Sequence, residues 1–201
     1  MKSFTFFGLE LVACAGLVMT PRPASEKLVS AAIALVGDQP ARVVDVGTGS
    51  GAIAIAIAAA LPQAEVFATD TSAAAVALAR LNVCRAGLSS RVTVLRGNLL
   101  DPISGRVDLI VANLPYLPIT EEGRRPELAN EPPEAVFAPG DGLGPYRRLI
   151  AASRRRMSDE GTLIIQFHGD VLTATRETLD VLSSTLSDRA HAADGQFPLA
   201  A

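Results

Sequence analysis

The stretch RVVDVGTGSGAIAIAIAAAL at positions 42–61 decides the expected fold. It opens with a short run rich in β-branched valine, which is typical of a fully buried parallel strand. Glycines follow at Gly47, Gly49 and Gly51, where the backbone can come close to a bound ligand. The almost wholly apolar run from about Ala52 to Leu61 then predicts a helix that packs against a sheet. Strand, glycine turn and helix together predict one unit of a parallel α/β sheet.

The same alternation of strands and helices continues along the chain. Helical spacing after Ser25, a good N-cap, predicts a helix that ends at Gly37. Further strands are expected at 65–69, 92–95, 107–112 and 161–167, and further helices at 73–86, 143–157 and 171–186. This order predicts an α/β fold with a doubly wound, mostly parallel sheet and helices on both faces. The polar segment 117–144 is expected to be a long functional loop.

The composition fits a chain that folds around one hydrophobic core. With 201 residues, of which 49% are hydrophobic, we expect a single domain over 1–201. We expect a lead-in and helix at 1–40, core motifs at 41–169, and a C-terminal helix and tail at 170–201. The net charge of −3 gives no basic footprint, which makes nucleic acid a less favoured partner.

The cysteine and histidine content argues against metal and disulfide chemistry. The chain has two cysteines, Cys14 and Cys84, without a C-x-x-C pair, and only two histidines. We therefore expect neither a zinc site nor a disulfide framework, and the cytoplasm is the expected compartment. The apolar run from Leu9 to Met19 is interrupted by Glu10 and is too short to span a bilayer, so no membrane association is expected.

The glycine turn admits two functional interpretations. The pattern Gly47-x-Gly49-x-x-Ala52 fits the dinucleotide fingerprint, in which Asp70 at the end of the next strand binds a ribose hydroxyl. The same turn also makes room for the methionine part of S-adenosylmethionine (SAM), with Asp70 holding the adenosine ribose. The plainer alternatives are a tight strand-to-helix turn at the glycines and a helix cap at Asp70.

Two features favour SAM, namely Asp45 and the loop at 113–116, which supplies an acceptor site for an amine that hydride transfer does not need. Asp45 precedes the first glycine by two positions, where its carboxylate can anchor an ammonium group directly or through water. Asn98 follows the third strand, where it can accept a bond from an adenine amino group, although a solvent-facing turn is an equal alternative. The expected cofactor-binding residues are Asp45, Gly47, Thr48, Gly49, Gly51, Asp70, Thr71, Asn98, Leu99 and Asn113.

The tetrapeptide Asn113-Leu114-Pro115-Tyr116 directly follows a buried strand and opens the long loop. Ligands of open α/β sheets lie outside the carboxyl ends of the strands, so these side chains are expected to face a substrate. An Asn acceptor, a turn stiffened by proline and a flat aromatic ring suit a planar amino group. Asn113 Oδ1 and the Leu114 carbonyl can each accept one of its hydrogens, and Tyr116 can stack on its plane. An isolated match of this kind is more often an ordinary turn.

Seven motifs occur together and in order, which makes the match more specific. They are FGLE at 7–10, TPRP at 20–23, DVGTGSG at 45–51, NLPY at 113–116, EP at 131–132, DGL at 141–143 and YRRLI at 146–150. In this set the chain resembles the catalytic domain of the HemK-type protein-(glutamine-N5) methyltransferases, which modify the glutamine of the release-factor G-G-Q motif. The resemblance covers about residues 6–169.

The resemblance implies a Rossmann-like, class I SAM-dependent methyltransferase fold. It implies that SAM lies over Gly47 to Gly51 and that Asn113 and Tyr116 hold the amide of a protein glutamine, with Pro115 shaping the turn. Arg22, Leu114 and Glu131 are the further residues expected on the substrate side. The implied transfer needs positioning and desolvation rather than an acid, a base or a metal.

The sequence departs from the family pattern in three respects. Leu114 stands where the commoner motif has its first proline. The chain begins too late to contain the helical domain with which bacterial members recognise the release factor, so an accessory subunit is a possible partner. Family members also end in a paired strand hairpin, whereas 188–201 offers only weakly β-like runs.

Alternative functions remain open at this stage. The substrate can instead be an exocyclic amino group of an RNA or DNA base, for which a duplex would require base flipping. A catalytically silent SAM-binding subunit is the alternative from another class. Arginines of the loop and the following helix, namely Arg124, Arg125, Arg147, Arg148, Arg154, Arg155 and Arg156, can meet an acidic partner or RNA, although a solvated helix face is favoured.

Overall fold

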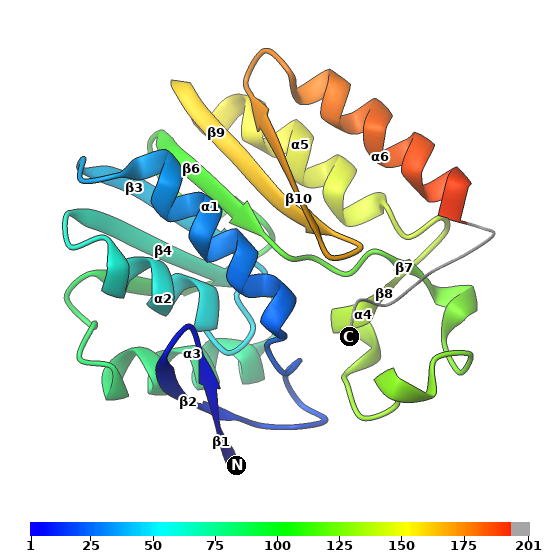
Figure 1. The fold of residues 1–201 in the computed structure, drawn as a ribbon, viewed down its shortest axis with the longest axis horizontal. Coiled ribbons are helices and arrows are strands. Elements are labelled where there is room, and N and C mark those ends of the chain that lie inside the picture. Colours follow the sequence, from blue (N-terminus) through cyan, green and yellow to red (C-terminus); the bar gives the residue numbers. More distant parts are fainter. Residues whose placement is uncertain (194–201) are drawn as a thin grey trace.

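The computed structural model describes residues 1–193, and its centre is a six-stranded sheet in the order β10-β9-β6-β3-β4-β5 (Figure 1). The strands are β3 (Ala41–Val46), β4 (Ala64–Asp70), β5 (Val92–Arg96), β6 (Val107–Ala112), β9 (Met157–Phe167) and β10 (Asp170–Thr175). All neighbours pair in parallel except β9 and β10, which are antiparallel. This arrangement confirms the predicted α/β fold with a mostly parallel sheet.

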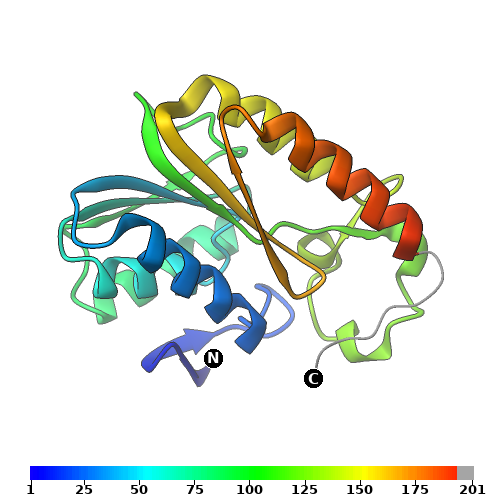
Figure 2. The same cartoon turned by 45° about the horizontal axis from the view of Figure 1, so that its top comes forward.

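Helices cover both faces of the sheet, as the alternation of elements predicts. Residues of α1 (Glu26–Val36), α2 (Ala52–Ala60) and α3 (Ala73–Arg85) share one buried cluster with strands β3 to β6. Residues of α5 (Gly144–Arg156) and α6 (Leu179–Ala193) share a second cluster on the other face. Figures 1 and 2 show α5 and α6 lying side by side near β10, away from α1 to α3.

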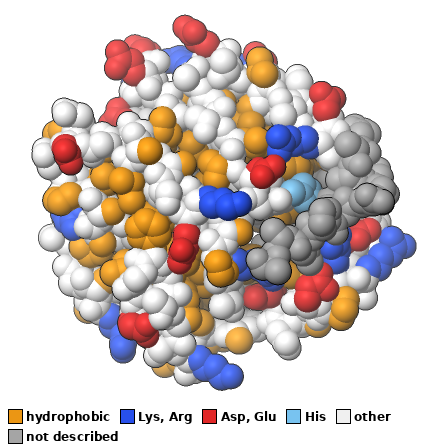
Figure 3. All heavy atoms as spheres, viewed as in Figure 1, with side chains coloured by type: hydrophobic (Ala, Val, Ile, Leu, Met, Phe, Trp, Pro, Cys, Tyr) orange, Lys and Arg blue, Asp and Glu red, His pale blue; other side chains and the backbone are white. Residues whose placement is uncertain are grey.

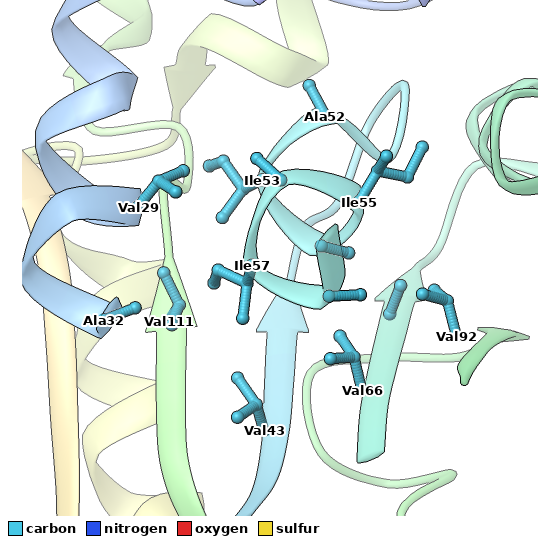
Figure 4. Close-up of a cluster of buried hydrophobic side chains, with 14 of the residues drawn as sticks. Val29, Ala32, Val43, Ala52, Ile53, Ile55, Ile57, Val66, Val92 and Val111 are labelled. Atoms are coloured by element: carbon cyan, nitrogen blue, oxygen red, sulfur yellow. The ribbon is translucent and has the colours of Figure 1, made fainter. Parts of the chain in front are cut away.

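The first cluster explains why α2 is almost entirely apolar. Every residue from 52 to 58 is buried, because this helix contacts α1, α3 and the strands beneath it. Figure 4 shows Ile53 and Ile57 on the side of α2 that faces Val29 of α1 and Val111 of β6. Burial of such branched side chains contributes roughly 1.5–3 kcal/mol each. The strand, turn and helix of 42–61 therefore form the centre of this layer.

The strand order reverses next to β3. The chain runs from β3 to β4 and β5 on one side and then returns through β6 on the other side of β3. In open α/β sheets this reversal opens a crevice outside the carboxyl ends of the strands. The glycine turn after β3 and the Asn113 tetrapeptide after β6 therefore lie at neighbouring strand ends.

A two-stranded hairpin precedes the sheet, where the sequence pattern indicated only an apolar segment. Strands β1 (Lys2–Phe6) and β2 (Leu9–Ala13) pair antiparallel. The buried side chain of Asn82, in α3, accepts a bond from Val12 N–H and donates to Val12 O and Ser50 O. This one amide fastens the hairpin and the glycine turn to the same helix.

The predicted helix at 171–186 is wrong over its first half. Residues 170–175 form β10, which pairs with β9 through the two-residue turn His168-Gly169, and α6 begins only at Leu179. Both turn residues have positive φ, 51° and 82°, as tight hairpin turns of primed type require. This hairpin precedes α6 and differs from the terminal one considered for 188–201, of which 188–193 belong to α6 and 194–201 lie outside the described residues. Strand β9 also begins at Met157 rather than near 161.

The segment 117–143 contains short ordered elements rather than an open loop. They are β7 (Leu117–Pro118), η2 (Ile119–Glu121), η3 (Pro126–Leu128), α4 (Pro133–Val136) and β8 (Phe137–Ala138). Strands β7 and β8 pair in parallel, and buried Leu117, Leu128 and Val136 form a small apolar cluster of their own. Among the described residues, no helix has both the length and the apolar character that crossing a membrane demands.

Candidate active site

A cavity of about 390 Å³ lies at the carboxyl ends of β3, β4 and β6. Its wall is built from residues 17–19, the glycine turn, 69–72, 97–99, 113–115 and parts of 132–139, with Pro145 and Arg148 from α5. This volume lies within the roughly 300–1,000 Å³ usual for small-molecule sites. Segments far apart in the sequence therefore meet around one ligand-sized space.

The glycine turn has a backbone that other residues adopt only with strain. Gly47, Gly49 and Gly51 have φ values of 73°, 57° and 83°. A Cβ on Gly47 would lie 2.7 Å from Cδ2 of Leu114, and one on Gly51 would lie 3.2 Å from Cα of Ala79. The N–H groups of Gly47 and Thr48 both donate to Thr69 O at the end of β4, at 2.8 and 3.0 Å. All three positions need glycine because of their backbone conformation, and Gly47 and Gly51 also need it because a Cβ there would lie too close to a neighbouring residue.

Asp70 joins the glycine turn to the start of α3. Its Oδ2 accepts the Gly49 N–H and its Oδ1 accepts the Ser72 N–H, both at 2.9 Å. The cap of α3 is Ser72, whose hydroxyl accepts the Ala75 N–H, so the helix-capping interpretation of Asp70 is wrong. Asp70 lines the cavity with its remaining acceptor capacity, which suits the hydroxyls of a ribose.

Asp45 lies behind the glycine turn and not in the cavity wall. Its side chain is fully buried, and its Oδ2 accepts the Thr48 hydroxyl at 2.6 Å and the Ala54 N–H at 3.2 Å. Burial raises the pKa of Asp45 to about 7, the two hydrogen bonds lower it, and the charge of Asp70 raises it further. Asp45 Oδ1 has no hydrogen-bond partner among the described residues. Asp45 thus supports the turn from below.

The expected cofactor residues divide accordingly. Those that line the cavity are Gly47, Gly49, Asp70, Thr71, Asn98, Leu99 and Asn113, whereas Asp45, Thr48 and Gly51 do not. Their sources are the ends of β3, β4, β5 and β6, which a parallel sheet brings to one edge. The structure shows that the lining residues lie around one cavity, and the role assigned to each of them stays a prediction.

Two contacts from distant elements hold the Asn113 tetrapeptide. Asn113 Nδ2 donates to the hydroxyl of Ser25 at 3.1 Å. The Leu114 N–H donates to the Tyr146 hydroxyl at 3.1 Å, and that hydroxyl donates in turn to Gln166 O. Tyr146 is fully buried, and burial raises the pKa of its hydroxyl far above the usual range. The start of the loop is therefore fixed both at a side chain and at the backbone.

Leu114 fills the space beside the glycine turn. The side chain is buried, lines the cavity and reaches the position that a Cβ on Gly47 would occupy. Leu114, at the position of the commoner proline, thus packs the Asn113 tetrapeptide against the glycine turn. Pro115 also lines the cavity.

The structure separates Tyr116 from the cavity wall that Asn113 and Pro115 form. Its ring packs against Phe167 and His168, with centroid distances of 5.1 and 4.8 Å. Burial raises the pKa of Tyr116, and the positive charge of Arg22 opposes that rise. Burial lowers the pKa of His168 to about 4, so this imidazole is neutral at neutral pH. The predicted stacking role of Tyr116 stays a prediction.

The two remaining substrate-side residues lie next to the cavity rather than in its wall. The carboxylate of Glu131 accepts the Thr20 N–H at 3.0 Å, which fastens the segment before α1 to the 117–143 segment. Arg22 lies close enough to Tyr116 to affect its titration. Sequence reasoning missed Glu134 and Arg148, which do line the cavity.

The arginines considered as a partner-binding surface mostly face carboxylates. Arg147 forms an ion pair with Asp141 at 2.6 Å, Arg125 approaches Glu121 at 3.6 Å, and Arg154 pairs with Asp180. Figure 3 shows basic and acidic side chains interspersed over the face in view. The exposed pairs of Arg147 and Arg154 contribute about 1 kcal/mol or less each, and they favour the solvated interpretation for these side chains.

Comparison with protein families decides between the two interpretations of the glycine turn. A family model described as methyltransferase small domain matches residues 23–125, from the turn before α1 through the Asn113 tetrapeptide. The chain belongs to this family. Membership of the methyltransferase small-domain family favours the SAM interpretation of the glycine turn over the nicotinamide one. Among the described residues, no cluster of His, Cys, Asp or Glu is placed to hold a metal ion.

Curated relatives of this family member carry the name release factor glutamine methyltransferase. The one from Deinococcus radiodurans is 41% identical over 150 residues, covering 74% of this chain and 53% of the relative. That from Xylella fastidiosa strain Temecula1 is 38% identical over 177 residues, covering 87% and 64%. The chain spans between about half and two thirds of the length of such relatives. The resemblance inferred from the motifs is confirmed.

Solved structures support the fold of the family member. A ribosomal protein L11 methylase from Lactobacillus delbrueckii subsp. bulgaricus superposes with a TM-score of 0.56 at 23% identity, covering 86% of this chain and 71% of that one. A precorrin-6y C5,15-methyltransferase from Geobacter metallireducens gives a TM-score of 0.55 at 16% identity, covering 90% and 76%. At these identities the likeness concerns the fold alone.

Proposed function

We propose that this protein is a SAM-dependent N-methyltransferase whose acceptor is the side-chain amide of a protein glutamine, with a peptide release factor as the substrate. The observation that carries this proposal is the position of Asn113, whose amide lines the cavity while its Nδ2 is bound to Ser25. The names of the curated relatives support glutamine as the acceptor.

The residues around the cavity fit SAM. Backbone at Gly47 and Gly49 can approach the ligand closely, because these positions carry no Cβ. Asp70 is placed to accept ribose hydroxyls, and Asn98 with Leu99 offers a polar and an apolar contact for an adenine. When bound, SAM supplies an electrophilic methyl group on a sulfonium centre.

Asn113 makes the amide nitrogen of the substrate available for reaction. Its Nδ2 already donates to Ser25, so Oδ1 is the group left to accept a hydrogen from the substrate amide. A conjugated amide nitrogen is a poor nucleophile, and two acceptors that hold both hydrogens favour localisation of its lone pair. The Leu114 carbonyl is the second acceptor: the Tyr146 hydroxyl lies 3.4 Å from it but has its shorter bond to Gln166 O, and a carbonyl oxygen has two lone pairs with which to accept.

The remaining residues position groups and exclude water rather than transfer protons. Leu114, Pro115, Phe137 and Pro139 give the acceptor end an apolar wall. His168 has its pKa lowered to about 4, but it lies outside the cavity wall, as Tyr116 does. Holding two reactants in an attack geometry can itself contribute roughly 7–11 kcal/mol to lowering the barrier.

The test is a labelling experiment with three acceptors. The purified chain is incubated with methyl-labelled SAM and a release factor bearing G-G-Q, its Gln→Ala variant, or bulk RNA. We expect label on the release factor alone, at the glutamine by mass spectrometry. Label on RNA alone would establish the nucleobase alternative. SAM binding by calorimetry without any labelled acceptor would favour a silent SAM-binding subunit or a missing recognition partner.

A further inference from the structure

Ser25 occupies an unusual place at the start of α1. The 3-10 turn Pro23–Ser25 runs directly into the helix, so the backbone of Ser25 is already helical, with φ −75° and ψ −12°. A capping serine normally has an extended backbone that aims its hydroxyl at the first helical N–H groups. Ser25 makes no such side-chain bond. Ser25 therefore stands at the predicted N-cap position, but the prediction that its side chain caps the helix is wrong.

The Ser25 hydroxyl instead turns toward the cavity residue Asn113. The residue is only 2% exposed, and its Oγ accepts from Asn113 Nδ2 at 3.1 Å across 88 positions of sequence. The register of β6 with β9 pairs Ala112 with Ile165, whose side chains lie in the α5–α6 cluster. Asn113 follows Ala112 and therefore turns to the opposite face, which α1 covers.

We propose that Ser25 is a positioning residue that fixes the Asn113 amide with its Oδ1 toward the substrate. This inference rests on the proposed function. An asparagine amide that rotates freely presents either its oxygen or its nitrogen, and only the oxygen can accept a hydrogen from the substrate amide. A buried bond at Nδ2 removes that freedom before the substrate arrives, which is the purpose of preorganisation.

The proposal requires that Ser25 itself be rigid. Its N–H donates to Arg22 O at 2.9 Å. The helix that it begins is anchored by Leu28 and Val29, which are fully buried, and by the Glu26 carboxylate, which accepts the Phe7 N–H at 2.8 Å. Because these contacts hold α1 in place, the Ser25 hydroxyl holds the Asn113 side chain at a fixed position in the cavity wall.

The kinetic test compares three single variants with the release-factor substrate. We expect Ser25→Ala to lower kcat/KM for the glutamine substrate about tenfold, which corresponds to about 1.4 kcal/mol, with little change in SAM affinity. Ser25→Thr keeps the hydroxyl and is expected to restore most of the activity. The matched control is Ser153→Ala in α5, because Ser153 is also buried and bonded, at 2.8 Å to Leu149 O, but lies outside the cavity wall.

A second measurement does not need turnover. Side-chain amide signals of Asn113, assigned with the Asn113→Ala variant in ¹⁵N–¹H spectra, report directly on the bond at Nδ2. We expect one of the two hydrogens to resonate downfield in the wild type and in Ser25→Thr, and to shift toward the value of an exposed amide in Ser25→Ala. A wild type that methylates no acceptor yet shows this pattern refutes the proposed function and leaves the Ser25 bond established.

Several results would overturn the inference. Wild-type kcat/KM in Ser25→Ala would remove the positioning role. Equal losses in Ser25→Ala and Ser25→Thr, or an equal loss in Ser153→Ala, would indicate a packing effect without a role for the hydroxyl. Two unperturbed Asn113 amide signals in the wild type would show that Nδ2 is not bound to Ser25.

Discussion

Two halves of the cavity are held in different ways. The cofactor half, made of the glycine turn 47–51, Asp70 and 97–99, is fixed by contacts among residues that are close in the sheet. The acceptor half, made of 113–116 and the 117–143 segment, depends on long-range bonds. These come from Ser25 to Asn113, Tyr146 to Leu114, and Glu131 to Thr20. Bonds within the cofactor half, such as Gly49–Asp70 and Thr69–Leu99, join positions 21 and 30 apart, whereas the Asn113–Ser25 and Thr20–Glu131 bonds of the acceptor half span 88 and 111 positions.

The difference has a functional consequence. A local strand-turn-helix unit can hold a cofactor with few demands on the rest of the chain. An acceptor site must discriminate between substrates. Because its side chains come from several elements, each can be replaced to alter that specificity without disturbing the others. Variants should therefore affect cofactor binding and acceptor use separately, according to the half in which they lie.

Glycine replacements should break the two halves independently and with the largest effects. In Gly142→Ala the Cβ would lie 2.2 Å from Tyr116 O, and in Gly51→Ala it would lie 3.2 Å from Ala79 Cα; both residues have φ above 80°. We expect each variant to lose more than about 3 kcal/mol of stability or to shift its loop. Gly142→Ala should mainly lower transfer to the peptide, whereas Gly51→Ala should mainly weaken SAM binding. Calorimetry and turnover distinguish these outcomes.

The matched control for the glycine pair is Gly87→Ala. This residue also has positive φ, 69°, but a Cβ there has no neighbour within 4 Å. It should cost only the strain of the left-handed backbone, about 1–2 kcal/mol. Equal loss of SAM binding in Gly51→Ala and Gly142→Ala would contradict the division into halves.

The buried carboxyl of Asp45 should make the stability of the cofactor half depend on pH. The pKa of Asp45 is about 7 in the folded chain against an ordinary value of 3.8, so between these pH values the folded state binds more protons than the unfolded state. The free energy of unfolding should therefore fall as pH rises from about 4 to about 7, by a few kcal/mol, and then level off. Urea denaturation of the SAM-free protein at a series of pH values measures this.

Asp45→Asn isolates that contribution. The amide oxygen can still accept from Thr48 and Ala54, while no charge develops in the core. We expect the variant to lose the part of the pH dependence that falls between about 4 and 7. An unchanged pH profile in Asp45→Asn would show that other groups cause the decline.

Removing the Tyr146 hydroxyl should weaken the acceptor half moderately. Tyr146→Phe leaves the Leu114 N–H and Gln166 O without their shared partner in a buried place, which costs about 1–3 kcal/mol. In a chain of this size that loss lowers Tm by about 2–4 °C per kcal/mol. Tyr116→Phe, in a half-buried ring, is the control and should have a smaller effect on Tm. Equal shifts in Tm would argue against a special role for the Tyr146 hydroxyl.

Local patterns predicted the cofactor half well, because its signals are contiguous. The run at 42–61 specifies a strand, a glycine turn and a helix, and the structure contains all three. The helix predicted at 171–186 was wrong over its first half because the apolar spacing there fits a helix or a strand equally well. The positive φ values at His168 and Gly169 form a tight turn, after which the chain pairs with β9 as a strand.

The acceptor half was predictable only in its motif. Asn113 could be located from its place after a buried strand, but the bond from Ser25 joins residues that no spacing connects. The same is true of Asn82, whose buried amide lies within an alanine-rich helix that gives no polar signal. Tyr146 was within a quoted motif, YRRLI, yet nothing local indicates that its hydroxyl reaches Leu114. Tertiary contacts of this kind are set by the packing of whole elements.

The most direct test of the account compares two asparagines that line the cavity after different strands, Asn113 after β6 and Asn98 after β5. Methyl transfer to the release-factor glutamine and SAM affinity by calorimetry are measured on the same preparations of Asn113→Ala and Asn98→Ala. We predict that Asn113→Ala lowers transfer at least about 100-fold with little change in SAM affinity, and that Asn98→Ala mainly weakens SAM binding. Transfer retained in Asn113→Ala, or SAM binding lost equally in both variants, would contradict the account.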